Sequence, residues 1–211
     1  MLSDAWLCGE MPAEADLARA CYLQHIADIV RAISQVPNVG TLLKRLASGP
    51  LDSLDRAPSP AKDALWELEV LAHLLGCGAQ VEIAEPDLRV ELPHGCIGIA
   101  CKRRYSEKNF PKALSTAVSQ IKEAGIPGIV AVNVEELLPA SMYLSLPTGE
   151  ELAQRLIKFN DAFLKDHEAR LKGYMDNGRL VGVWVSSVSL ANLTHEKIFY
   201  VRPADDFVDS S

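Results

Sequence analysis

Asp87 and Lys102 are the two residues of this sequence whose types and positions most clearly fit a chemical task. Asp87 follows Pro86, and Lys102 comes directly after the apolar residues Ile99, Ala100 and Cys101. Side chains alternate between the faces of a strand, so Ala100 and Lys102 should face one side and Cys101 the other. A carboxylate can hold a divalent cation, and an ammonium group can polarise a phosphate or a water molecule. The pair therefore predicts a metal-dependent phosphodiesterase site.

The elements that would position this pair are predicted from apolar periodicity and from proline and glycine. Leu88, Val90 and Leu92 alternate with polar residues, which is typical of a strand. The run 129–134 is almost wholly apolar, as expected of a strand that is buried on both faces. Pro111 indicates the start of a helix. The predicted order is a helix at 60–75, strands at 79–84, 87–92 and 96–102, a helix at 111–123 and a strand at 129–134.

Glu67 lies on the apolar stripe of the first of these helices, one turn before Leu71. Glu69 falls on the flank of the same helix, beside Trp66 and Lys62. A carboxylate on an apolar stripe must be paired, protonated or bound to a metal, unless it reaches solvent from a boundary position. Considered together with Asp87 and Lys102, Glu67 is better interpreted as part of the predicted site.

These residues resemble the PD-(D/E)XK (restriction-endonuclease-like) nuclease superfamily, whose pattern is Pro-Asp, a spacer, and then acid-x-Lys. Pro86, Asp87, Lys102 and the helical Glu67 match this pattern, and the order of elements over 61–134 is similar to the common core of the superfamily. The resemblance implies an α/β fold with a restriction-endonuclease-like core (helix, three strands, helix, strand) around a mixed central sheet. The sequence departs from the pattern at Ala100, where the superfamily has an acid.

The resemblance also implies an activity, a cofactor and a partner. Glu67, Asp87 and Lys102 would be catalytic in a divalent-metal-dependent endonuclease that hydrolyses nucleic-acid phosphodiester bonds, DNA in preference to RNA, in defence or repair. Asp87, Glu67 and the backbone carbonyl of Cys101 would bind Mg²⁺ or Mn²⁺. Lys102 would orient water or stabilise the charge on the phosphate. Such enzymes often dimerise to cut both strands, so a homodimer is an option.

Three explanations of Ala100 are open at this stage. The missing acid could have been replaced by Glu85, which is two residues from Asp87 and so on the same strand face, or by Glu69. The site could have degenerated, which would leave a catalytically inactive nuclease-fold protein that acts as a nucleic-acid-binding or scaffold module. Ala100 could also be an engineered replacement of a glutamate. The plain alternative to all three is an ordinary α/β domain with a Pro-Asp turn and a lysine at the end of a strand.

The distribution of charge limits how the chain could bind nucleic acid. Its net charge of −7 argues against general binding of polyanions, so a local basic patch would be needed. The segment 97–112 contains such a patch, and within it Arg103, Arg104 and Lys108 are candidates to contact the phosphate backbone, although a solvated face would look the same. Gln120, on the helix that follows, is a weaker candidate for the same interface.

Outside 61–134 the sequence predicts supporting structure. Residues 1–60 are predicted as a helical N-terminal extension with helices at 13–33 and 41–47, and no chemistry is expected of them. Residues 61–211 are predicted as the α/β domain, in which a helix at 150–172 and strands at 180–190 and 197–201 complete the segment 150–202. The acidic residues at 205–209 are expected to form a frayed tail.

The remaining patterns narrow the class of protein and the cellular compartment that we expect. The five cysteines show no CxxC spacing, which favours reduced thiols in the cytoplasm over a disulfide framework or a zinc site. We expect neither a membrane span nor a signal peptide, because no apolar run is long enough and the N-terminus is acidic. The sequence also lacks a dinucleotide-binding motif, a P-loop and a nucleophile elbow.

Overall fold

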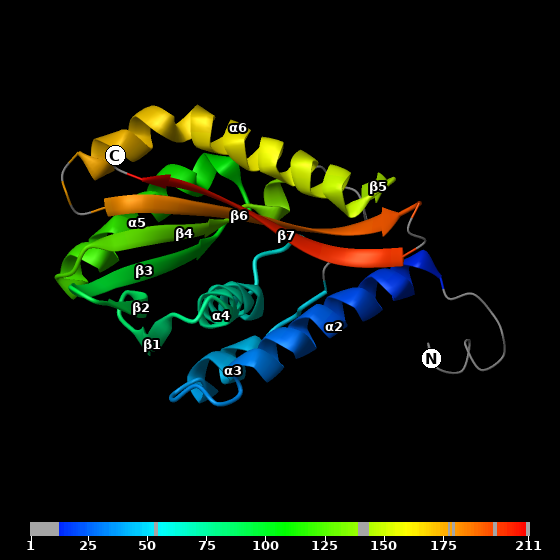
Figure 1. Ribbon diagram of the computed structural model, residues 1–211, viewed down its shortest axis with the longest axis horizontal. Helices are drawn as coiled ribbons and strands as arrows, with labels where there is room; N and C mark the ends of the chain where they lie inside the picture. Colours follow the sequence, from blue (N-terminus) through cyan, green and yellow to red (C-terminus); the bar gives the residue numbers. More distant parts are fainter. Residues whose placement is uncertain are drawn as a thin grey trace.

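One mixed sheet separates two layers of helices in the computed structural model (Figure 1). The structure describes residues 13–52, 55–138, 144–176, 178, 180–195 and 198–209, with the backbone alone for Glu14 and for 198–209. The helices α2 (Glu14–Ile33), α3 (Gly40–Leu46) and α4 (Pro60–Gly76) cover one face of the sheet. The helices α5 (Phe110–Ala124) and α6 (Gly149–Met175) cover the other.

The sheet has the strand order β1-β2-β3-β4-β6-β5, and β7 pairs with β6. Neighbouring strands are antiparallel from β1 to β3, whereas β3, β4 and β6 are parallel to one another. The short β5 runs parallel to β6, and β7 runs antiparallel to it. This confirms the predicted α/β class with a mixed sheet. The bounds are β1 (Gln80–Ala84), β2 (Asp87–Leu92), β3 (Gly95–Arg103), β4 (Gly128–Asn133), β5 (Leu144–Leu146), β6 (Leu180–Leu193) and β7 (Ile198–Asp209).

Helix α4 is the centre of the layer that carries the candidate site residues. It begins where the Ser59 side chain accepts a hydrogen bond from the backbone N–H of Ala61, with Pro60 in its first turn. It is buried around most of its circumference, since α2 and α3 pack against the side that does not face the sheet. Lys62 and Trp66, which the helical periodicity places on an outer flank, are also buried. Lys62 donates to Glu136, and Trp66 donates to the backbone of β4 at Ala131.

The N-terminal helices share one apolar core with the rest of the domain. Side chains of α2 and α3 lie in the same cluster as those of α4 and of strands β2 and β3. This cluster includes Tyr22, Ile26, Leu42, Leu46, Leu65, Leu68, Leu88 and Ile99. Because removal of either part would expose this cluster, residues 13–52 belong structurally to the α/β domain and not to a separate appendage.

The second core lies between the sheet and α5 and α6. It contains Ala100 of β3, Val130 of β4 and Phe110 of α5, together with Phe163 and Leu171 of α6. Helix α5 ends at Gly125, whose φ of 71° lies in the left-handed region that favours glycine.

The C-terminal strands differ in extent from the prediction. Both strand-like runs do extend the sheet, as β6 and β7. The expectation of a frayed tail at 205–209 is wrong, because β7 continues through Asp209, which pairs with Gly182. The long β6 offers unpaired backbone groups along its whole outer edge, and this pairing outweighs the local preference of an acidic run for solvent.

Among the described helices, none combines the length and the apolar character that crossing a membrane requires.

Candidate active site

Asp87 begins β2 and reaches across to β3. The preceding Pro86 lies against Gly98 of β3, where a side-chain Cβ would come within 2.7 Å of the proline Cδ. Gly98 therefore allows Pro86 to approach β3 closely. At the same end of β2, Asp87 Oδ2 accepts a hydrogen bond of 2.7 Å from the backbone N–H of Cys101. This bond fixes the carboxylate of β2 beside the last residues of β3.

Lys102 lies beside this carboxylate. Its Nζ is 3.4 Å from Asp87 Oδ2 and donates a 2.9 Å hydrogen bond to the carbonyl oxygen of Cys101. The side chains of Lys102 and Asp87 are 19% and 18% exposed, so water screens the pair only in part. The two residues that the sequence singled out are thus in contact.

Glu67 approaches from α4 and is held by a residue that sequence reasoning did not select. Its Oε2 accepts a 2.9 Å hydrogen bond from Nη1 of Arg45 in α3, and its side chain is 11% exposed. Arg45 lies in the segment to which no chemistry was assigned. No local pattern could have identified it, because its partner is 22 residues away and belongs to another helix.

The charges of these residues are coupled, and we call Arg45, Glu67, Asp87 and Lys102 the Asp87 site. Burial raises the pKa of Glu67; Arg45 opposes this rise, the charge of Asp87 adds to it, and Lys102 lowers it. Burial also raises the pKa of Asp87, whereas Lys102 and the N–H of Cys101 lower it. The charge of Lys102 therefore acts on both carboxylates, and the convergence of Glu67, Asp87 and Lys102 on one metal ion stays a prediction.

The other residues considered for metal binding lie in different settings. Glu85 is exposed, although its charge is close enough to raise the pKa of Asp87. The Cys101 thiol is buried on the α4 side, and its pKa is raised by burial and by Asp87 and Glu67, so it stays protonated at neutral pH. Ala100 is fully buried in the apolar core beneath α5. Among the described cysteines, Cys77, Cys96 and Cys101 are free thiols.

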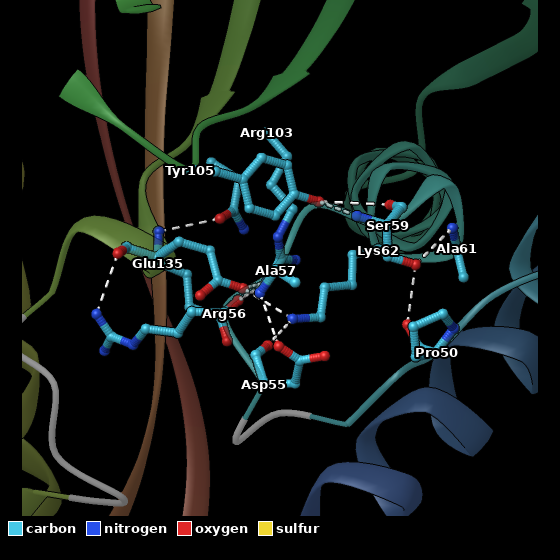
Figure 2. Close-up of polar contacts among 12 residues, drawn as sticks. Pro50, Asp55, Arg56, Ala57, Ser59, Ala61, Lys62, Arg103, Tyr105 and Glu135 are labelled. Carbon is cyan, nitrogen blue, oxygen red and sulfur yellow. Dashed lines mark hydrogen bonds and ion pairs between the residues drawn. The ribbon is translucent and has the colours of Figure 1, made fainter. Parts of the chain in front are cut away.

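Arg103, predicted to contact nucleic acid, lies inside the protein instead (Figure 2). Its guanidinium donates to Glu135 at 2.8 Å and to Glu136 at 3.2 Å. Lys62 also donates to Glu136, at 3.2 Å, and to the backbone carbonyl of Asp55. We call Lys62, Arg103, Glu135 and Glu136 the buried ion-pair network. The run Lys-Arg-Arg looks solvated in sequence, but alternation along β3 points Arg103 toward the α4 layer.

The other candidates for nucleic-acid contact differ in accessibility. Lys108 is exposed in the short 3-10 helix Glu107–Asn109, and Arg104 is half-buried. Gln120 is half-buried on α5, and its Oε1 is buried without a hydrogen-bond partner among the described residues. Only Lys108 of this set is fully open to a ligand.

The Asp87 site offers two carboxylates, those of Glu67 and Asp87, to a metal ion. Within the part of the chain that the structure describes, no group of three or more His, Cys, Asp or Glu side chains is arranged to hold a metal. Two carboxylates, Glu67 and Asp87, do lie close enough for Asp87 to raise the pKa of Glu67. A bound cation would relieve that repulsion. Mg²⁺ is commonly held by one or two carboxylates with several waters, so the binding of Mg²⁺ or Mn²⁺ here stays a prediction.

Comparison with known proteins gives no family for this chain. No family model matches the sequence, and no curated protein matches it. The residues of the Asp87 site and the order of the elements around them must therefore carry any inference about function.

Proposed function

We propose that this protein is a PD-(D/E)XK-type nuclease that hydrolyses DNA phosphodiester bonds with Mg²⁺ or Mn²⁺. The observation that carries the proposal is the contact of Asp87, at the start of β2, with the backbone of Cys101 and the Nζ of Lys102 in β3. The order α4, β1, β2, β3, α5, β4, with β3 and β4 parallel, supports a restriction-endonuclease-like core.

Each residue of the Asp87 site would have a distinct role. Mg²⁺ or Mn²⁺, when bound, would supply Lewis-acid activation of the phosphate and of water. Asp87 and Glu67 would hold the ion, with the carbonyl of Cys101 as a further oxygen. Lys102 donates to that carbonyl and to Asp87, so it competes with a cation for the same oxygens. Once released from them, its ammonium group would stabilise the negative charge that develops on the phosphate.

DNA would reach the site through a small group of cations. The net charge of −7 requires a local positive surface, and Lys108 and Lys112 are exposed close in sequence to Lys102. Arg103 is not part of this surface, because it is buried. Cutting of both strands would need a second copy of the chain. A cytoplasmic role in defence or repair agrees with the exposed free thiol of Cys77.

The test is a cleavage assay on plasmid and linear DNA with Mg²⁺, with Mn²⁺ and with EDTA. We expect cutting that EDTA abolishes and that Lys102→Ala and Asp87→Asn reduce by about 100-fold or more. Lys122→Ala, which removes an exposed lysine from the last turn of α5, is the matched control and should cut normally. Cutting that survives EDTA or Lys102→Ala, or its absence under all conditions, would contradict the proposal.

A second candidate function is a nuclease-fold protein that binds nucleic acid without cutting it. Two observations favour it: Arg45 already pairs with Glu67, and Ala100 occupies the acid position inside an apolar core. The variant Arg45→Gln separates the two candidates. If Glu67 is a metal ligand whose ion pair with Arg45 competes with metal binding, this variant should bind Mn²⁺ several-fold more tightly than the unaltered protein.

Calorimetry of Mn²⁺ binding gives the measurement. Arg31→Gln is the control, because Arg31 is an exposed arginine paired with Asp28 on α2. Equal and negligible Mn²⁺ binding by both variants, together with retained DNA binding, would favour the non-catalytic candidate.

A further inference from the structure

A cavity of about 190 Å³ lies between α2, α4 and β6 and shares no lining residue with the Asp87 site. Its lining includes His25 of α2, Trp66, Glu69 and His73 of α4, and Trp184 and Ser186 of β6. Glu67 and Glu69 are two positions apart on α4, which places them about 200° apart around the helix. The same helix therefore presents one carboxylate to each site.

The aromatic walls of this cavity meet at an angle. The rings of Trp66 and Trp184 have centroids 6.1 Å apart and planes inclined at 66°. His73 lies 5.1 Å from Trp184 at 54°. The indole N–H of Trp66 donates to the backbone carbonyl of Ala131 at 3.1 Å, which fixes its orientation. Because these rings are inclined to one another, they do not form two parallel walls between which a flat group could stack. The space that they border therefore favours a compact group over a flat one.

One carboxylate oxygen in this cavity lacks a partner. The Glu69 side chain is 10% exposed, and its Oε1 lies 3.0 Å from Nε2 of His25. Its Oε2 is buried without a hydrogen-bond partner among the described residues. A buried carboxylate oxygen with no partner is costly, and the charge of a nearby cation would offset part of that cost.

The local electrostatic potential is negative. Burial lowers the pKa of His25, but Glu69, Glu135 and Asp28 outweigh burial and raise it overall. Behind the cavity, the charge of Glu69 also acts on the buried ion-pair network. Among the described residues, Lys62 and Arg103 form ion pairs with the two carboxylates of that network, whereas the ion pair of Glu69 is with His25. One negative charge is therefore left uncompensated when His25 is neutral.

From this geometry we propose that the cavity binds a methylated ammonium group, with the cation against the faces of Trp66 and Trp184 and its charge balanced by Glu69. A cation over an aromatic face is attracted by the ring quadrupole, most strongly over tryptophan and in a desolvated setting. The cavity is smaller than the roughly 300 Å³ at the lower end of pockets for drug-sized ligands, which suits a head group of a few heavy atoms. The group could belong to a free quaternary amine or to a methylated lysine of a protein.

The test compares choline with 3,3-dimethyl-1-butanol, which has the same shape and no charge. Calorimetry at about pH 8.5, well above the ordinary imidazole pKa of about 6.5, favours the neutral form of His25. We expect choline to bind roughly ten- to thirty-fold more tightly than the neutral isostere. Equal binding of the two would show an apolar pocket only and would overturn the proposal, as would no choline binding up to about 10 mM.

Two variants locate the binding. Glu69→Gln keeps the shape of the side chain and should weaken choline binding by about ten-fold, whereas Asp87→Asn should leave it unchanged. Unchanged choline binding by Glu69→Gln, with circular dichroism confirming its fold, would overturn the proposal. Peptides with trimethyl-lysine and with unmodified lysine distinguish the source: tighter binding of the methylated peptide than of choline identifies a protein ligand, and the reverse identifies a free amine. Because Asp87→Asn reports on the other site, failure here is distinct from failure of the nuclease proposal.

Discussion

Ala100 is the residue at which the Asp87 site departs from the acid-x-Lys pattern, and its surroundings are apolar. It is fully buried with Phe110, Leu114 and Val130 in the core beneath α5. In the proposed nuclease-like site, apolar packing therefore occupies the position of the acid in the acid-x-Lys pattern. Glu85 is exposed, yet its charge acts on Asp87, so migration of the acid to position 85 stays a prediction for metal-binding measurements.

The variant Ala100→Glu should be less stable than the unaltered protein. A carboxylate at this position would be buried among apolar side chains without a cation, and we expect a loss of roughly 3 kcal/mol in the free energy of unfolding. Urea denaturation measures this loss. Ala32→Glu, at an exposed position of α2, is the control and should change stability little. Unaltered stability of Ala100→Glu would instead mean that the new carboxylate reaches Lys102.

The raised pKa of Asp87 makes stability depend on pH. Because burial raises this pKa in the folded protein, the folded state binds the proton more tightly than the unfolded state does. The stabilisation by the protonated carboxyl is present below the unfolded pKa of about 3.9 and is lost as the pH rises through the folded value. The unaltered protein should therefore lose stability relative to Asp87→Asn as the pH rises from about 4 through the folded pKa of Asp87. Urea denaturation of both proteins across this range tests it, and a constant difference would refute it.

At the scale of the elements, the sequence predicted the order from α4 to β4 because apolar periodicity and proline are local signals. The predicted strand 96–102 corresponds to β3, and the helix 111–123 corresponds to α5. The environment of each face was harder to predict. Lys62 was assigned to a flank because a helical pattern does not reveal its distant partner Glu136. The partners of Arg103 likewise lie more than 30 residues away.

Arg103→Met should destabilise the protein strongly. It removes the guanidinium that joins β3 to Glu135 and Glu136. Glu136 would still pair with Lys62, whereas Glu135 would lose the ion pair with Arg103. Breaking a buried ion pair by removing one partner costs about 3–5 kcal/mol. Arg104→Met is the matched control on the neighbouring half-buried arginine and should cost less. Thermal and urea unfolding would give both values, and equal losses would argue against a special role for the network.

At the scale of the whole molecule, the two halves of the predicted division share one core. The division at residue 60 followed prolines and glycines, which mark turns but carry no information on packing. The same limit explains why Arg45 was not predicted as a partner of Glu67. Glu67, Asp87 and Lys102 were selected from motif and spacing. The contact with Arg45 forms only because α3 packs on α4.

Deletion of residues 1–57 should therefore unfold the remaining chain or leave it without fixed tertiary structure. It would expose Leu65, Leu68 and their neighbours on α4 and would leave Glu67 without Arg45. Near-ultraviolet circular dichroism and the cooperativity of urea unfolding measure the effect. A truncated chain that unfolds as cooperatively as the full chain would contradict the shared core.

Helix α4 carries residues of both proposed sites on its opposite sides. One side carries Glu67 and the Asp87 site, and the other carries Trp66, Glu69 and His73 of the aromatic cavity. The helix packs against α2, α3 and the sheet. If a ligand bound at one site moved helix α4, the other site would bind its own ligand with a different affinity. Thermodynamic linkage requires the reverse effect to be equally large.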